Sequence, residues 1–463
     1  MKRKEQKLNL LINLLKAVFV LIAGVTYYNI WEKYYQMQVY ADVYYALGNY
    51  AMAAIYPALF LVFSKVYGGL QVGLARLTDI IFSNGIAVVF ASVIMYFQVC
   101  LVTRRIITPW VFLSMSVFLI IVMALWAWVC NKVYFKLFPP KRTLILYENL
   151  EAYNTISKIA GLKENFTVTD SMPITEEEHL LITAMNNAEA VFVCGASADR
   201  RNFVLKYCTQ NHIKIFLSPK ITDIIISGSQ RMHLLDAPLL YCDNQKSSLT
   251  RDFVKRSCDL IFATLMLILT SPIMLVVAVG IKLTDGGPVF FKQRRLTRGG
   301  KSFEVLKFRS MIVDAEKDGV ARLATTNDDR ITPIGKTIRK LRLDELPQLI
   351  NIFKGEMSIV GPRPERPEIA AQYEQEMPEF NLRLQVKAGL TGYAQVYGKY
   401  NTTPYNKLQM DLMYIADNSL LLDLKLMLMT FKIMFVPEST EGVAEGQTVA
   451  GINVEEADEK KEK

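Results

Sequence analysis

Two acidic residues, Asp344 and Glu345, stand side by side at the end of a strongly basic segment. The chain from Lys282 to Arg342 holds fifteen Lys or Arg residues but only seven Asp or Glu residues. No His follows His233, so chemistry in this part of the chain must be done by carboxylates, assisted by Lys, Arg or a metal ion. A carboxylate pair among so many cations indicates a site that handles an anion such as phosphate.

The local pattern suggests two readings of this acidic pair. Thr332 followed by Pro333 predicts the start of a short helix, and a second helix is expected to begin near Leu343 or Asp344. The pair would then lie at a helix N-terminus, which favours negative charge and binds phosphate. The alternative is that Asp344 only caps the helix. The third residue after it is Pro347, which has no N–H for a cap to accept, so the pattern favours catalysis.

An adjacent Asp and Glu can divide the work of a phosphoryl transfer between them. The carboxylate of Asp344 can attack phosphorus and form an acyl phosphate, which replaces one difficult transfer with two easier ones. Glu345 is then placed to hold Mg²⁺, which would screen the repulsion between the carboxylate and a diphosphate.

Cationic residues near the pair in sequence are candidates for binding the phosphate groups of a substrate. Lys307 and Arg309 lie in the run KFRSM, Arg339 lies five residues before Asp344, and Arg363 lies in the run GPRP. Guanidinium groups bind phosphate oxygens in a bidentate manner. For any single Arg, a solvated surface charge is as good an explanation as phosphate binding. Three Arg residues near one carboxylate pair favour phosphate binding.

Residues 389–396, GLTGYAQV, predict a turn and a short strand that could shape a sugar or nucleotide pocket. Thr391 and Gln395 are the candidate polar contacts in this segment, and structural roles for both remain open. A helical region further on carries three polar residues to which we assign structural roles, Asp411, Tyr414 and Asp423.

Composition indicates a membrane protein, because 51% of the residues are hydrophobic. Four apolar stretches have the length of a spanning helix, namely residues 8–30, 43–64, 80–101 and 110–130. Lys and Arg residues lie before the first stretch and after the fourth, which predicts that both ends face the cytoplasm. The net charge of +9 points to anionic partners such as phosphates or lipid headgroups, and no recognition motif favours nucleic acid.

Residues 141–249 predict a small parallel α/β domain, with short β-rich runs between polar helical segments. Such Rossmann-like folds bind nucleotides at their strand ends. Here Glu148, Asn149 and Leu150 follow the first strand, where a dinucleotide fingerprint would need glycines. A structural or oligomerising module is therefore favoured, and it makes a homodimer an alternative to a monomer.

A further apolar stretch, residues 260–281, is flanked by basic clusters on both sides. A spanning helix would leave one cluster outside, against the usual charge rule. A re-entrant helix avoids this, and Ser271 and Pro272 near the middle supply the membrane break. The alternative is a Pro-kinked fifth span, which would place the following domain outside.

Several motifs occur together and in order: GGPVFFKQRR (286–295), KFRSM (307–311), LDELPQLINIFKGEMSIVGPRP (343–364) and GLTGYAQV (389–396). They closely resemble the bacterial sugar transferase domain of polyprenyl-phosphate hexose-1-phosphate transferases, over about residues 251–437. The chain as a whole resembles the long members of that family, similar to undecaprenyl-phosphate galactose or glucose phosphotransferases. The resemblance implies a nucleophile at Asp344, a Mg²⁺-binding residue at Glu345, a phosphate-binding residue at Arg339 and the re-entrant helix.

The expected fold class is membrane α plus α/β. Residues 1–140 form a four-helix transmembrane bundle and residues 141–249 a Rossmann-like domain. Residues 250–437 form a mixed α/β phosphoglycosyl transferase domain with a re-entrant helix at about 254–283. Residues 438–463 are polar and are expected to be a disordered tail.

The resemblance implies an enzyme of the bacterial inner membrane with its catalytic domain on the cytoplasmic side. It would transfer hexose-1-phosphate from UDP-galactose or UDP-glucose to undecaprenyl phosphate and release UMP, which starts capsular, exopolysaccharide or O-antigen synthesis. One alternative is a catalytically silent membrane scaffold, which predicts damage at the Asp, Glu and Arg positions. Another is an ordinary glycosyltransferase, which would release UDP.

Overall fold

The computed structural model describes residues 2–35, 46–150, 153–154, 156–157, 165–242, 249–313, 330–398, 402–434, 447–449 and 452–453. Within it the chain forms two compact units, Met1–Ser218 and Pro219–Lys463. Residues 243–248, a polar stretch that the sequence indicates as a linker, lie outside the described residues.

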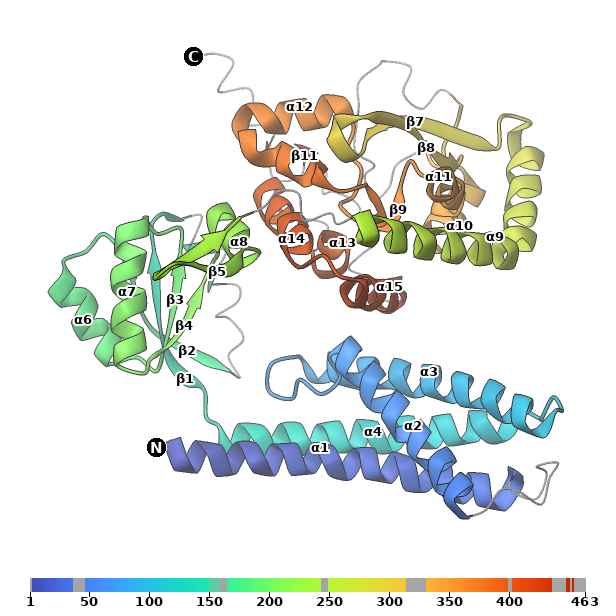
Figure 1. Cartoon of the computed structure of the whole chain (residues 1–463), viewed down its shortest axis with the longest axis horizontal. Coiled ribbons are helices and arrows are strands. Elements are labelled where there is room, and N and C mark those ends of the chain that lie inside the picture. Colours follow the sequence, from blue (N-terminus) through green and yellow to red (C-terminus); the bar gives the residue numbers. More distant parts are fainter. Residues whose placement is uncertain are drawn as a thin grey trace. The chain divides into compact units, whose positions relative to one another are not determined.

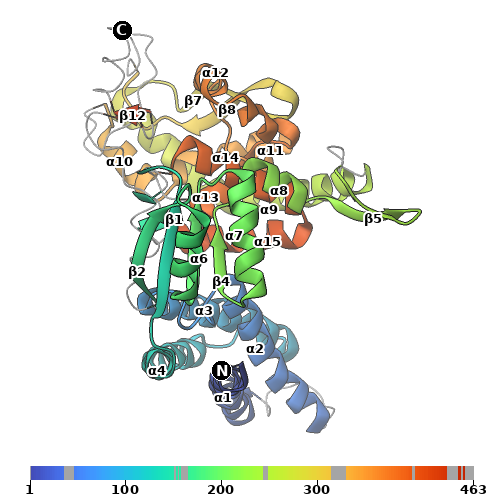
Figure 2. The ribbon, with the colours of Figure 1, turned by 90° about the vertical axis from the view of Figure 1, so that its left-hand side faces the viewer.

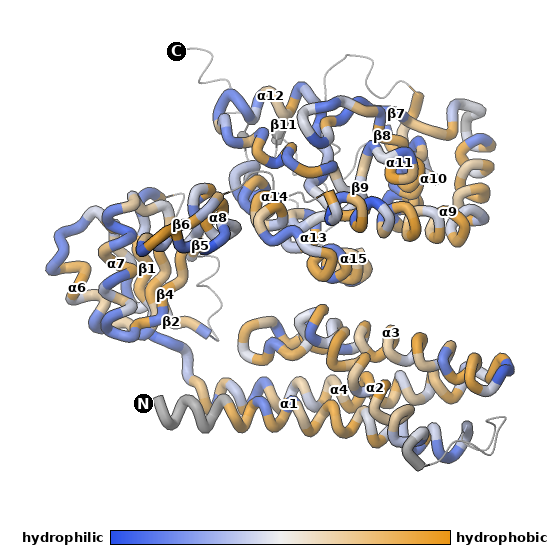
Figure 3. The backbone as a smooth tube through the Cα atoms, viewed as in Figure 1, coloured by the Kyte–Doolittle hydropathy of each residue, from blue (hydrophilic) through white to orange (hydrophobic). Residues whose placement is uncertain are grey.

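The first unit begins with four long apolar helices (Figures 1 and 3). They are α1 (Lys2–Ile30), which continues as a π-helical turn (Trp31–Tyr35), α2 (Ala46–Tyr67), α3 (Leu77–Thr103) and α4 (Trp110–Leu137). Each is long and apolar enough to cross a membrane, so the four helices expected from the sequence are present. Helix α1 packs against α2 and α4, and α3 packs against α2 and α4.

The same unit contains a four-stranded parallel sheet in the order β2-β1-β3-β4. Its elements are β1 (Lys141–Tyr147), β2 (Phe166–Pro173), α6 (Glu178–Asn186), β3 (Ala190–Cys194), α7 (Ala198–Gln210) and β4 (Lys214–Leu217). The parallel α/β arrangement agrees with the sequence prediction. Strand β2 was not foreseen, because its sequence FTVTDSMP is polar and its residues are mostly exposed.

The second unit opens with a short helix and a β-hairpin, which Figure 2 shows extending from it. These elements are α8 (Ile221–Ser227), β5 (Gln230–Leu234) and β6 (Ala237–Tyr241). Helix α8 packs against α14 (Pro404–Asp417). Residues 219–241 therefore belong to the same compact unit as the motifs that follow.

The remainder of the second unit combines helices with small two-stranded sheets. Its helices are α9 (Leu249–Asp285), α10 (Pro333–Lys340), α11 (Gln348–Lys354), α12 (Pro367–Glu376), α13 (Tyr393–Tyr397) and α15 (Leu420–Met434), with 3-10 turns η3 (Arg298–Gly300), η4 (Leu343–Glu345) and η5 (Pro378–Gln385). Strands β7 (Phe290–Leu296) and β8 (Ser302–Phe308) pair antiparallel, and β9 (Ser358–Val360) and β10 (Gly389–Thr391) pair parallel.

Helix α9 is bent, and Figure 1 shows it as two limbs that meet at a sharp change of direction. Pro272 lies inside the helix and has no N–H to donate to the carbonyl of Ile268, four residues before it. The hydroxyl of Ser271 donates to that same carbonyl oxygen at 2.8 Å. The Ser-Pro pair thus removes one backbone hydrogen bond of the helix and replaces it with a side-chain bond.

Both limbs of α9 pack against the body of the second unit. On the first limb, Ala263 lies in a core with Val305 and Leu349. On the second limb, Val277 lies in a core with Ile338. Both limbs of the helix therefore belong to one compact unit.

The C-terminal segment 438–463, expected to be disordered, lies mostly outside the described residues. Within it, β11 (Gln447–Val449) pairs antiparallel with β12 (Ile452–Asn453).

Candidate active site

Asp344 and Glu345 lie in the 3-10 turn η4, which precedes α11. Arg342, directly before the turn, has the left-handed backbone conformation, with φ of 53°. Helix α11 begins only at Gln348 and has Pro347 at its N-cap. A helical segment therefore begins at Leu343 as expected, with the acidic pair in its first turn, but this first turn is a 3-10 helix and the α-helix follows it. The N-cap positions of η4 and α11 belong to Arg342 and Pro347, so Asp344 caps neither and its carboxylate is available for another role.

Buried contacts between α11 and β8 fix the position of this turn. Asn351 is 1% exposed, and its side-chain oxygen accepts the backbone N–H of Leu306 at 2.9 Å. Its amide nitrogen donates to the carbonyl of Glu304 at 2.7 Å and to the carboxylate of Glu356 at 2.6 Å. Because Lys307 follows Leu306 on β8, these bonds also hold Lys307 beside the turn.

Glu345 is paired with two cations. Its Oε1 lies 3.1 Å from Lys307 Nζ and 3.0 Å from Arg363 Nη2, and only 14% of its side chain is exposed. Burial alone would raise the pKa of Glu345, but Lys307 and Arg363 outweigh burial and hold the pKa far below its usual range. Glu345 is therefore a fixed negative charge. The same contact raises the pKa of Arg363.

Asp344 differs from its neighbour. Among the described residues, no hydrogen bond or ion pair involves its carboxylate. Burial and the adjacent charge of Glu345 raise the pKa of Asp344, while Lys307, Arg339 and Arg363 act in the opposite direction. An acidic side chain without a partner, close to three cations, is suited to attack an anionic electrophile.

The remaining predicted cations lie at different places. Arg339, in the last turn of α10, is near enough to Asp344 for its charge to lower the pKa of that carboxyl group. Arg309 is 6% exposed, and its guanidinium packs against Gly287, where an added Cβ would lie 2.0 Å from Nη1. The structure thus brings Lys307, Arg339 and Arg363 to the acidic pair.

Thr391 and Gln395 have internal partners. The hydroxyl of Thr391 lies 2.7 Å from that of Thr430 and joins β10 to α15. Gln395 donates to the carbonyl of Leu390 at 3.1 Å. Among the described residues, neither side chain has a contact with the acidic pair.

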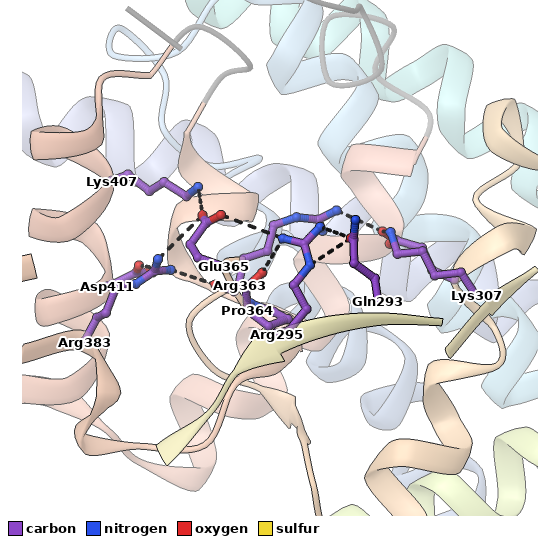
Figure 4. Close-up of polar contacts among 10 residues, drawn as sticks. Gln293, Arg295, Lys307, Arg363, Pro364, Glu365, Arg383, Lys407 and Asp411 are labelled. Atoms are coloured by element: carbon purple, nitrogen blue, oxygen red, sulfur yellow. Dashed lines mark hydrogen bonds and ion pairs between the residues drawn. The ribbon is translucent and has the colours of Figure 1, made fainter. Parts of the chain in front are cut away.

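A second ionic network, which residue spacing does not predict, surrounds the GPRP segment (Figure 4). Glu365 is 12% exposed at its side chain, accepts from Lys407 and lies 3.5 Å from Arg383 Nη1 and 3.9 Å from Arg295 Nη1. Burial alone would raise the pKa of Glu365, but Lys407, Arg383 and Arg295 lower it to about 2. Arg383 Nη2 also forms an ion pair with Asp411 Oδ2 at 2.7 Å.

This network holds the backbone that carries Arg363. Arg295 Nη1 donates to the carbonyl of Pro364 at 3.0 Å, and Arg383 Nη2 donates to the carbonyl of Arg363 at 2.8 Å. The charged residues of this network stand in or beside the motifs of the sequence, since Arg295 lies in GGPVFFKQRR and Glu365 directly follows GPRP. Their pairing joins positions far apart in the sequence and could not be inferred from spacing.

The acidic pair can contribute to a magnesium site. The described residues contain no cluster of three or more His, Cys, Asp or Glu side chains suited to a metal. Both cations bind Oε1 of Glu345, and among the described residues no contact uses its Oε2 or the carboxylate of Asp344. Mg²⁺ commonly uses one or two carboxylates and completes its shell with water and substrate phosphates, so these oxygens fit the ion.

Comparison with known proteins identifies the domain that carries this site. Residues 250–437 match the family described as bacterial sugar transferase. A UDP-glucose:undecaprenyl-phosphate glucose-1-phosphate transferase of Caulobacter vibrioides is 40% identical over 184 residues, which are 39% of this chain and 68% of the relative. The chain belongs to the bacterial sugar transferase family.

Two longer relatives each match about half of this chain. A UDP-N-acetylgalactosamine-undecaprenyl-phosphate N-acetylgalactosaminephosphotransferase of Aeromonas hydrophila is 37% identical over 49% of this chain and 54% of the relative. A UDP-glucose:undecaprenyl-phosphate glucose-1-phosphate transferase of Escherichia coli is 38% identical over 47% of this chain and 47% of the relative. The chain thus spans about half the length of these two relatives.

Proposed function

We propose that this chain transfers hexose-1-phosphate from a UDP-hexose to undecaprenyl phosphate and releases UMP. The observation that carries the proposal is the contrast within the acidic pair: Glu345 is fixed by Lys307 and Arg363, whereas the carboxylate of Asp344 has no partner among the described residues. The names of the three relatives above support the choice of a UDP-sugar donor and an undecaprenyl phosphate acceptor.

In the first step, a carboxylate oxygen of Asp344 attacks the β-phosphorus of the UDP-hexose. A bond forms between that oxygen and phosphorus, and the bond from the β-phosphorus to the bridging oxygen breaks. The electron pair leaves with UMP, and the hexose-1-phosphate stays on Asp344 as an acyl phosphate. Lys307, Arg339 and Arg363 reduce the repulsion between the two anions.

In the second step, a phosphate oxygen of undecaprenyl phosphate attacks the phosphorus carried by Asp344. The bond between phosphorus and the Asp344 oxygen breaks, which restores the carboxylate and yields undecaprenyl diphosphate hexose. Each displacement exchanges one phosphorus–oxygen bond for another and needs no oxidant or reductant.

We further propose Mg²⁺ as the cofactor, which the carboxylate of Glu345 would hold. When bound, it supplies positive charge that screens the diphosphate and stabilises the leaving phosphate. Removing divalent ions with EDTA should abolish UMP release, and adding Mg²⁺ should restore it. Full activity in EDTA would exclude this role.

The bent helix α9 supports an interfacial position for the site. Its apolar stretch has the length of a membrane span, yet residues of both limbs pack against the same globular unit. A helix that enters the membrane and returns on the same side meets both conditions and keeps the acidic pair at the level of lipid phosphates. We therefore propose a re-entrant helix in the bacterial inner membrane, with the catalytic domain on the cytoplasmic side, where UDP-sugars are found.

The nucleotide product tests the reaction class. The membrane-embedded chain, supplied with a UDP-sugar and undecaprenyl phosphate, should release UMP. Release of UDP would instead indicate an ordinary glycosyltransferase, and absence of turnover with every UDP-sugar tried would indicate a scaffold.

We propose galactose or glucose as the hexose and the start of capsular, exopolysaccharide or O-antigen synthesis as the purpose of the reaction. A panel of UDP-sugars that includes UDP-N-acetylgalactosamine tests this choice. A clear preference for the N-acetylated donor would overturn it.

A further inference from the structure

A large cavity lies in the second unit, away from the acidic pair. Its volume is about 950 Å³, and its walls come from α8, from the first turns of α9, from η5 and the segment after it, and from α14. Neither Asp344 nor Glu345 lines it, and Lys307 and Arg363 are absent from its walls. The proposed reaction therefore leaves this cavity without a role.

The cavity wall carries more positive than negative charge. Five cationic side chains and two carboxylates line it: Arg251, Lys255, Arg256, Arg298, Lys387, Asp252 and Asp259. Arg298 pairs with Asp252 at 2.9 Å, and Lys255 pairs with Asp423 at 2.7 Å. Asp259 accepts the backbone N–H of Ile359. The three remaining cations, Arg251, Arg256 and Lys387, therefore outnumber the one remaining carboxylate of the wall, Asp259.

These three cations have no carboxylate partner among the described residues. Arg251 Nη2 is buried and makes no hydrogen bond to any residue that the structure describes. Arg256 donates to the carbonyl oxygens of Ile352 and Phe353 at 2.6 and 2.7 Å. Burial lowers the pKa of Lys387, and the neighbouring charges of Arg256 and Arg298 lower it further, partly offset by acidic residues nearby. A group of cations that repel one another is stabilised by an anion.

A buried polar group in the same wall lacks a partner as well. Ser358 is 0% exposed and lines the cavity, and within the described part of the chain its hydroxyl makes no hydrogen bond. A buried hydroxyl without a partner costs free energy, and a ligand oxygen would remove that cost. The rest of the wall is largely apolar, with Ile225, Leu249, Leu382 and Ile415 among its residues.

We propose that this cavity binds the phosphate group of an anionic ligand, at a site separate from the Asp344–Glu345 pair. Arg251, Lys387 and the hydroxyl of Ser358 contact the phosphate oxygens. The same chemistry could be presented by the headgroup of an acidic phospholipid or by a soluble phosphate. The apolar wall and the position of the cavity beside the start of α9 favour the lipid.

Native mass spectrometry of the full-length protein in neutral detergent tests the proposal. We expect one phosphatidylglycerol molecule to be retained at concentrations at which phosphatidylcholine with the same acyl chains is not. The Arg251→Gln/Lys387→Gln variant should bind phosphatidylglycerol at least about tenfold more weakly, as the loss of charge-assisted hydrogen bonds predicts. The control variant Lys292→Gln/Lys301→Gln loses the same charge at exposed positions and should bind as the wild type does.

A second experiment distinguishes a lipid headgroup from a soluble phosphate as the ligand. Inorganic phosphate is titrated against the wild type and the double variant while the unfolding temperature is followed. Stabilisation of the wild type alone, without lipid retention, assigns the site to a soluble anion. The proposal is overturned if neither ligand distinguishes the two proteins, or if the control variant loses binding equally. Should Arg251→Gln/Lys387→Gln not fold, the single variant Lys387→Gln is measured in the same way, with Lys301→Gln as its control.

Two further measurements separate this site from the catalytic one. UMP release by Arg251→Gln/Lys387→Gln in detergent should match the wild type, while its lipid binding is lost. If Arg363→Gln loses the lipid and Arg251→Gln/Lys387→Gln keeps it, the anion sits at the acidic pair and this inference fails without affecting the proposed function.

Discussion

Arg363 Nη2 lies 3.0 Å from Glu345 Oε1, and this contact joins the GPRP segment to the turn that carries Asp344. Lys307 approaches the same oxygen from β8 at 3.1 Å. Three segments of the second unit therefore meet at one carboxylate oxygen. Of the two carboxylates in the acidic pair, only that of Asp344 has no partner among the described residues. This contrast is the basis of the proposed mechanism.

Replacing Arg363 tests the value of this contact. In Arg363→Lys the charge is kept, but the planar group that reaches Glu345 is lost. We expect UMP release to fall by about 10- to 100-fold, the effect of losing a charge-assisted hydrogen bond of 1.5–3 kcal/mol. The matched control is Arg294→Lys at an exposed position of β7, which should keep its rate. Equal rates for wild type and Arg363→Lys would show that the contact is dispensable.

Asn351 should be a strong determinant of stability. In Asn351→Ala, the backbone N–H of Leu306 and the carbonyl of Glu304 both lose their buried partner. We expect a loss of about 2–4 kcal/mol, because unsatisfied buried groups keep their desolvation cost. The unfolding temperature in detergent measures it, with exposed Asn381→Ala as the control. A shift no larger than that of the control would contradict the proposed coupling between α11 and β8.

Glu365 should make the stability of this unit depend on pH. Its pKa is about 2 in the folded chain, against an ordinary value of 4.5. As the pH falls below 4.5, the unfolded chain takes up this proton first, so stability decreases progressively toward pH 2. Over that range the loss amounts to about 3 kcal/mol.

Unfolding temperatures from pH 7 to pH 3 check this expectation. Glu365→Gln should be less stable than the wild type at pH 7, and the difference should shrink as the pH falls. Glu368→Gln, at an exposed position of α12, serves as the control. A difference that stays constant with pH would refute the assignment.

The re-entrant path of α9 can be tested by labelling from each side of the membrane. With exposed Cys242 replaced by Ser, Leu249→Cys and Thr284→Cys place a thiol at each end of the apolar helix. An impermeant maleimide should label both from the cytoplasmic side, because both limbs pack against one globular unit. Arg104→Cys, between α3 and α4, provides the reference for the opposite side. Labelling of the two ends from opposite sides would establish a fifth span instead.

Elements with a strong local signal were predictable from the sequence. The four apolar helices follow from stretches of about 20 apolar residues. The start of α10 follows from its cap, since Thr332 accepts the N–H of Gly335 at 3.0 Å and Pro333 occupies the first turn. Strand β2 was missed because its exposed, polar residues give no apolar alternation.

The local geometry of the site was less predictable. The turn before α11 depends on the left-handed conformation of Arg342, which nothing in an Arg side chain indicates. The pairing of Lys307 with Glu345 joins residues 38 positions apart, and the ionic network around Glu365 joins β7, η5 and α14. Residue types indicated which side chains could act, while their contacts depend on tertiary packing.

The covalent adduct tests the central claim most directly. The purified chain is incubated with a UDP-sugar and Mg²⁺ in the absence of acceptor lipid and is then analysed by intact-mass spectrometry. We expect the wild type to gain one hexose phosphate per chain and to release an equal amount of UMP. The Asp344→Asn variant should show neither. The control variant Asp411→Asn changes a buried carboxylate in the other ionic network and should keep the adduct if it folds. An adduct of the same mass on Asp344→Asn would contradict the account.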